Sequence, residues 1–119
     1  MRHRNKKHNL GGRPRDARRL LIGNLATSLI LHERIKTTKA KAKAVQPMID
    51  KLIHSAKTKT KVIAIREIMA VLQNEMSSRK LFDELLKRYE KRDTGFTSIA
   101  EIGFRAGDAA PLVQIELVK

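Results

Sequence analysis

The chain has 119 residues, a formal net charge of +14 and no cysteine. The lack of cysteine excludes disulfides, a thiolate nucleophile and cysteine-based zinc sites, and no apolar run approaches the ~18 residues of a membrane span. Residues 1–61 carry 17 Lys or Arg and three Asp or Glu, whereas residues 62–119 carry nine of each. A cationic charge gathered in one half of a chain is typical of proteins that bind nucleic acid.

The first twelve residues are predicted to form a flexible basic arm, followed by one globular domain over residues 13–119. Residues 1–12 contain almost no apolar side chain, so they cannot bury enough surface to offset their ordering entropy. A solubilising tail is the simpler interpretation, but the density of positive charge favours contact with RNA. The candidate contacts in the arm are Arg2, His3, Arg4, Lys6 and Lys7.

A first helix is predicted after Pro14, because proline suits a helix start and apolar residues then recur at helical spacing as far as Leu29. Gly23 is a weak point in this helix that permits close packing of another backbone. The positive charge of the arm continues into its first two turns. The candidate phosphate contacts there are Arg13, Arg15, Arg18 and Arg19.

Helical periodicity stops at residues 32–37, which predicts a short strand, and Thr37 or Thr38 is expected to cap the next helix. Pro47 predicts a kink or a restart within that helix. Its lysines form either a solvated face or a set of phosphate contacts near the helix start. The candidate contacts in this region are Lys36, Lys39, Lys41 and Lys43.

Two further helices are predicted. The apolar residues of 62–72 indicate a buried helix, and Ser77 or Ser78 is expected to cap the helix that follows, whose apolar face ends at Tyr89. The opposite face of this last helix is predicted to face solvent. It carries charges of both signs, on Asp83, Glu84, Lys87, Arg88, Glu90 and Lys91.

Near the end of the chain, apolar residues alternate with other residues on both sides of residues 105–111. This alternation predicts two strands joined as a hairpin. Arg105 in its turn either binds RNA or pairs with Asp108. The predicted order is arm, α, β, α, α, α, β, β. This order favours a two-layer α+β fold with helices packed on a small three-stranded sheet.

Only four aromatic residues are present, and all are predicted to lie in the core: Phe82, Tyr89, Phe96 and Phe104. Their number argues against single-strand binding on clustered aromatic rings and favours contacts to phosphates and to RNA shape. The four histidines have no metal-ligand spacing, and Glu33 beside His32 is interpreted as a strand-edge pair. We therefore predict no catalytic residue, cofactor, metal or small-molecule substrate.

Four blocks of the chain resemble the L-seventeen family of bacterial-type large-subunit ribosomal proteins. The blocks are residues 1–4, residues 24–29 with 32–38, the lysine helix through Pro47, and residues 103–108 with Ala110-Pro111 and 115–117. They occur in family order over nearly the whole chain. The resemblance implies a structural constituent of the cytoplasmic large ribosomal subunit that binds its RNA and neighbouring ribosomal proteins, without contact to a membrane.

A DNA-binding architectural or regulatory protein with a helix-turn-helix is the alternative. Such a motif needs a recognition helix that offers polar side chains to the major groove. The best candidate, residues 62–72, is nearly all apolar and offers only Arg66 and Glu67. This composition disfavours the alternative.

Overall fold

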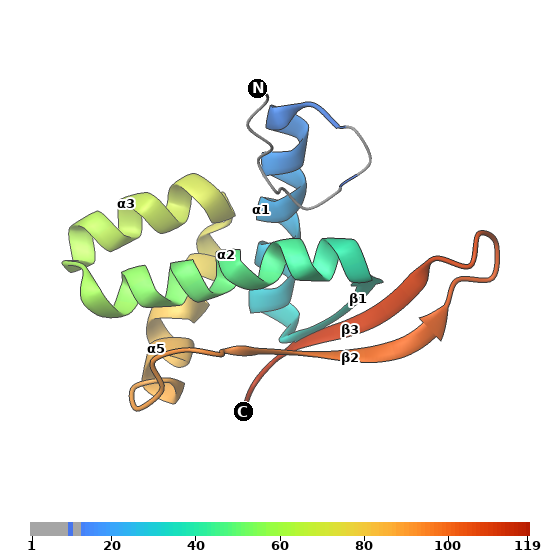
Figure 1. The fold of residues 1–119 in the computed structure, drawn as a ribbon. Helices are drawn as coiled ribbons and strands as arrows, with labels where there is room; N and C mark the ends of the chain where they lie inside the picture. Colours follow the sequence, from blue (N-terminus) through green and yellow to red (C-terminus); the bar gives the residue numbers. More distant parts are fainter. Residues whose placement is uncertain (1–9, 11–12) are drawn as a thin grey trace, which may run out of the picture.

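The computed structural model describes Leu10 and residues 13–119. The predicted arm, with Arg2, His3, Arg4, Lys6 and Lys7, lies outside the described residues apart from Leu10, which is buried. The elements are α1 (Arg15–His32), β1 (Arg34–Thr38), α2 (Lys39–Thr58), α3 (Lys61–Leu72), α4 (Glu75–Lys80), η1 (Leu81–Leu85), α5 (Leu86–Arg88), β2 (Thr97–Phe104) and β3 (Pro111–Leu117) (Figure 1). Because α4, η1 and α5 form one continuous helix with a π-helical middle, the predicted element order and the α+β class are confirmed.

β3 is the central strand of an antiparallel sheet with the order β1-β3-β2. Its residues Val113, Ile115 and Leu117 are buried and alternate with partly exposed ones, so one face of the sheet is apolar. That face belongs to the same core cluster as the apolar residues of the helices. The sheet and the helices therefore form two layers, as the predicted order of the elements favoured.

α2 lies at the centre of the core and crosses in front of α1 in Figure 1. Its apolar stripe packs against residues of every other helix and of the sheet. The buried residues of this stripe are Ala42, Val45, Ile49, Leu52, Ile53 and Ala56. Tyr89 and Phe96 close one end of the core with their ring centroids 5.0 Å apart, and the Tyr89 hydroxyl donates a hydrogen bond to the Val118 carbonyl. This bond joins the end of the last helix to the end of the sheet.

Of the kink or restart predicted at Pro47, the restart does not occur, because α2 runs without a break through this residue. Pro47 is exposed, while Val45 and Ile49 on either side are buried, and this burial holds both turns in place although one backbone hydrogen bond is lost. The predicted cap of the last helix is wrong. Asn74 caps the helix that contains α4, and Ser77 and Ser78 lie inside it.

The Asn74 side chain accepts hydrogen bonds from the backbone N–H groups of Met76 and Ser77, at 2.9 and 3.4 Å. The Ser77 and Ser78 hydroxyls instead donate to the Asn74 carbonyl, at 2.8 and 3.2 Å. Both serines are buried inside the first turns of the helix. The helix therefore starts at Glu75, and a serine in such a position bonds back to the preceding turn.

The prediction that all four aromatic residues lie in the core is wrong for Phe104. Tyr89 and Phe96 are buried and Phe82 packs against the core, but Phe104 is 76% exposed. The hairpin of β2 and β3 extends beyond the end of α2, so nothing from the helical layer covers its outer part (Figure 1). The position of this ring depends on how far the hairpin reaches, which local periodicity does not show.

Candidate nucleic-acid interface

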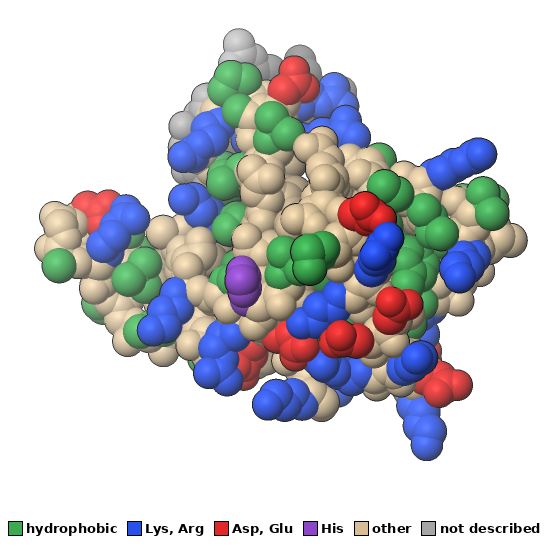
Figure 2. Space-filling model, turned by 180° about the vertical axis from the view of Figure 1, so that it is seen from behind, with side chains coloured by type: hydrophobic (Ala, Val, Ile, Leu, Met, Phe, Trp, Pro, Cys, Tyr) green, Lys and Arg blue, Asp and Glu red, His purple; other side chains and the backbone are tan. Residues whose placement is uncertain are grey.

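The amino end of α1 presents the first group of sequence-predicted cations. The helix begins directly after Pro14, whose carbonyl accepts a hydrogen bond from the Arg18 N–H at 3.0 Å. Arg15 and Arg19 are exposed and Arg18 is partly exposed. Arg13 is also exposed, and its guanidinium donates to the Leu10 carbonyl. In Figure 2, side chains of Lys and Arg flank this upper end of the molecule.

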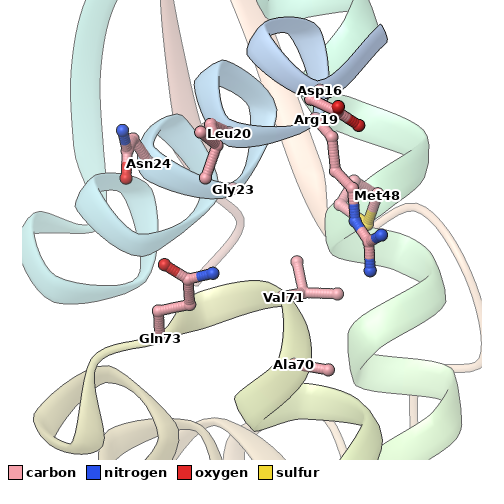
Figure 3. Close-up of a pocket in the computed structure, with 9 residues that line it drawn as sticks. All are labelled: Asp16, Arg19, Leu20, Gly23, Asn24, Met48, Ala70, Val71 and Gln73. Atoms are coloured by element: carbon pink, nitrogen blue, oxygen red, sulfur yellow. The ribbon is translucent and has the colours of Figure 1, made fainter.

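Arg19 extends from α1 toward Met48 at a cleft of about 380 Å³ between α1, α2 and α3 (Figure 3). Beside this cleft α1 packs very closely on the end of α3. A Cβ atom added to Gly23 would lie 2.8 Å from the Val71 carbonyl oxygen, which confirms the prediction that this glycine permits close backbone packing. The Thr27 hydroxyl, 2.9 Å from the Leu72 carbonyl oxygen, strengthens the same contact.

The second group of cations lies on β1 and at the amino end of α2. Lys36 is exposed on β1, an edge strand of the sheet. Lys39 donates a hydrogen bond of 3.0 Å to Glu101 of β2 and thereby lowers the pKa of that carboxyl. Lys41 and Lys43 follow in the first turns of the helix. The pair of Lys39 and Glu101 joins the amino end of α2 to the base of the hairpin.

Arg105 lies at the tip of the hairpin and binds Asp108 with two hydrogen bonds, of 2.9 and 2.6 Å. Asp108 also accepts a bond of 3.3 Å from the Ala110 N–H. These contacts lower the pKa of Asp108 from 3.8 to about 2, and the hydrogen bonds from the Arg105 guanidinium have the largest effect. Of the two roles predicted for Arg105, the structure therefore shows the pairing that holds the turn, while a contact with RNA stays a prediction.

Glu33 is a structural acid whose partner the sequence analysis did not identify. It does not pair with His32 at a strand edge; it follows α1 in a left-handed backbone conformation, with φ of 62°. Its carboxylate binds the Arg88 guanidinium through two hydrogen bonds, of 2.8 and 3.0 Å, and lies 3.0 Å from Lys80. These two cations lower the pKa of Glu33 from 4.5 to about 2. Arg88 is therefore a partner of Glu33, not part of a simple solvated face as predicted.

Some of the positive charge in residues 1–61 is also used within the fold. The Lys57 ammonium donates a bond of 3.0 Å to the Tyr89 carbonyl at the end of the last helix and lies 3.6 Å from Asp93. Lys59 binds Glu67 at 2.5 Å and lowers the pKa of that carboxyl. No sequence motif marks these lysines as different from the others, since their partners lie elsewhere in the chain.

The ion pairs within residues 13–119 use one set of cations and leave another set unpaired. The paired cations are Arg34, Lys39, Lys57, Lys59, Arg79, Lys80, Arg88 and Arg105. Seven sequence-predicted contacts form no ion pair in this part of the chain: Arg13, Arg15, Arg18, Arg19, Lys36, Lys41 and Lys43. They do not converge on one pocket, since the arginines lie at the amino end of α1 and the lysines lie on β1 and at the amino end of α2, which are apart in Figure 1. Such an arrangement suits a large polyanion better than a small ligand.

The described residues offer neither a metal site nor a membrane-spanning helix. No group of three or more His, Asp or Glu side chains within Leu10 and 13–119 could hold a metal ion. No helix in the same part of the chain is long and apolar enough to span a membrane.

The sequence of this chain is similar to those of known proteins over most of its length. The family model described as ribosomal protein L17 matches residues 21–118. The large ribosomal subunit protein bL17 of Neorickettsia sennetsu is 42% identical over 118 residues, which cover 99% of this chain and 100% of that protein. The bL17 proteins of Maricaulis maris and Caldanaerobacter subterraneus are 45% and 43% identical, over 93% and 90% of this chain and 79% and 95% of their own lengths.

Proposed function

The chain belongs to the ribosomal protein L17 family, and from this premise we propose that it binds large-subunit ribosomal RNA through phosphate contacts. As a member of this family it is a protein of the large ribosomal subunit and not an enzyme. In the proposed role the chain works on cytoplasmic ribosomes, where it stabilises the local shape of the RNA and contacts neighbouring ribosomal proteins. It requires no cofactor for this role.

The observation that supports RNA binding most directly is the division between paired and unpaired cations. Of the nine Lys and Arg residues in 62–119, four form ion pairs within the described part of the chain. Of the thirteen in 13–61, only four do, so nine are left without a carboxylate partner there, in the half that carries the whole net charge. Unpaired arginine and lysine side chains can release counterions from a phosphate backbone when they bind it, and this release drives association.

The alternative of a DNA-binding helix-turn-helix receives no support from the fold. α3, its candidate recognition helix, buries Ala64, Ile68 and Leu72 against the core. Its exposed side includes Val62, Ile63 and Met69, which offer no hydrogen bonds to base edges. With Arg66 and Glu67 as its only charged side chains after Lys61, this helix is poorly suited to read a major groove as a recognition helix does.

A charge-reversal experiment tests the proposal. One variant carries Arg15→Glu and Arg19→Glu, and a matched control carries Lys87→Glu and Lys91→Glu. All four residues are exposed, and the two pairs have the same spacing and the same change in net charge. Binding of the full-length proteins to transcribed large-subunit RNA and to duplex DNA is measured at several salt concentrations.

We expect the α1 variant to bind the RNA more than tenfold less tightly, a loss of about 1.4 kcal/mol or more, and the control to change little. Glutamate suits the amino end of a helix and disfavours its carboxyl end, so the control variant is the one expected to lose stability. If about six cations contact phosphates, affinity should fall roughly 10²- to 10³-fold between about 50 and 200 mM salt. Equal losses in both variants, a flat salt dependence, or a preference for duplex DNA would contradict the proposal.

A further inference from the structure

Phe104 is the feature of the hairpin that the fold leaves unexplained. Its ring is 76% exposed, although the large apolar residues of β3 are buried. Burial of such a ring normally contributes strongly to folding, so an exposed one on a rigid strand is available for an outside partner. The residues around it in the turn are small, namely Gly103, Ala106, Gly107, Ala109 and Ala110.

A β-bulge decides toward which side of the sheet Phe104 points. Glu101 pairs with Val113, but Gly103, not Ile102, pairs with Leu112, so Ile102 is an extra residue in β2. Because cross-strand partners share a face, Phe104, which pairs with Pro111, lies on the same side as Glu101 and the buried Val113. Without the extra residue, regular alternation would turn Phe104 to the opposite side.

The side to which the bulge turns Phe104 is the side that carries α2. Lys39 at the start of α2 reaches Glu101 on this face, at 3.0 Å. Beyond that contact the hairpin continues past the amino end of α2, as Figure 1 shows. The ring is therefore presented in the open, on the face of the hairpin that begins beside the lysines of α2.

The turn that follows Phe104 is held rigidly. The Arg105 N–H donates to the Ala110 carbonyl at 2.9 Å, and the Ala109 N–H donates to the Arg105 carbonyl at 2.9 Å. The paired side chains of Arg105 and Asp108 close the same loop at its surface. A ring on such a support loses little conformational freedom when it binds, which favours a specific contact.

We propose that Phe104 stacks on an unpaired base of the ribosomal RNA, an inference that rests on the proposed function and deepens it. One flat ring is sufficient for a base stack, because every base offers a π-face. A protein partner bound through apolar contacts needs a broader surface, and in the outer hairpin only Ile102 joins Phe104 among the large exposed apolar residues. The small residues of the turn let the RNA backbone approach, and Lys43, one helical turn after Lys39, adds unpaired charge at the start of α2.

Four variants of the full-length protein test the role of the ring: Phe104→Ala, Phe104→Leu, Phe104→Tyr and Phe104→Trp. Affinity for transcribed large-subunit RNA is measured for each, with Ile102→Ala as a control at the neighbouring exposed residue. We expect the alanine and leucine variants to bind about 5- to 100-fold less tightly, because stacking is lost, and the tyrosine, tryptophan and control variants to stay within about threefold. Thermal unfolding should be nearly unchanged in all of them, since the side chain is exposed.

The chain contains no tryptophan, so Phe104→Trp also introduces a single fluorescent reporter. Its emission should be quenched on RNA binding, whereas the emission of Ile102→Trp should change much less. Wild-type affinity in the leucine variant, or unquenched emission at position 104 in a complex that forms, would overturn the stacking proposal alone. Unchanged RNA affinity of Phe104→Ala with reduced incorporation into large subunits would show that the ring contacts a protein, and this too would overturn it. If the wild-type protein itself failed to bind the RNA, the proposed function would fail instead.

Discussion

Replacement of Glu33 by Gln should destabilise the protein at neutral pH and have no effect in strong acid. The Arg88 and Lys80 side chains bind the charged carboxylate and lower its pKa from 4.5 to about 2. A difference of this size corresponds to at most about 3–4 kcal/mol of unfolding free energy. Because 27% of the Glu33 side chain is exposed, solvent screening reduces the expected contribution to about 1–2 kcal/mol.

The pH dependence follows from the direction of the shift. The pKa of Glu33 is lower in the folded than in the unfolded state, so its stabilising contribution is fully present above pH 4.5 and is lost as the pH falls toward about 2. Urea unfolding of the wild type and of Glu33→Gln at pH 7, 5, 3 and 2 measures it. The difference between the two proteins should be equal at pH 7 and 5, smaller at pH 3 and close to zero at pH 2.

A matched control removes a carboxylate that has no such role. Glu84 is exposed and forms no ion pair with any residue in 13–119, so Glu84→Gln should shift the unfolding free energy by less than about 0.5 kcal/mol at each pH. A loss in Glu33→Gln that is as large at pH 2 as at pH 7 would refute the linkage argument. No loss at pH 7 would refute the role of the ion pair itself.

Two further predictions concern the close helix contact and the arm. Gly23→Ala should destabilise the protein by about 1–2 kcal/mol in urea unfolding, because the clash with the Val71 carbonyl outweighs the gain of about 1 kcal/mol in helix propensity; a more stable variant would show that α3 can move away at little cost. Deletion of residues 1–9, which keeps the buried Leu10, should leave the melting temperature nearly unchanged and weaken binding to large-subunit RNA at least tenfold, because four cations are removed. A large fall in melting temperature with unchanged affinity would mean that this segment serves the fold and not the RNA.

The local elements of this fold could be predicted because each depends on residues close together in the chain. The three-to-four-residue spacing of apolar positions indicated α1, α2, α3 and the helix from α4 to α5. The alternation of Val113, Ile115 and Leu117 indicated a strand with one buried face, and the structure buries all three. Even Gly23 was recognisable as a close approach, since glycine inside a helix needs a reason.

The uneven distribution of charge was readable from the sequence, but the pairing of individual cations was not. A count of cations shows which half of the chain carries the net charge, yet it does not show which side chains find partners. Lys39 pairs with a carboxylate 62 residues away, whereas Lys43, one helical turn later, forms no ion pair within the described residues. Only the packing of β2 against α2 distinguishes these two lysines.

The remaining features depend on contacts between segments far apart in the chain. Glu33 meets Arg88 across 55 residues, so its role became visible only when α1 and the last helix were placed side by side. An extra residue in β2 turns Phe104 to the side of the sheet that carries α2, and the ring is nevertheless exposed because the hairpin outreaches α2. Periodicity reports which residues share a face; it cannot report where a face ends or what lies opposite, since both follow from the relative placement of whole elements.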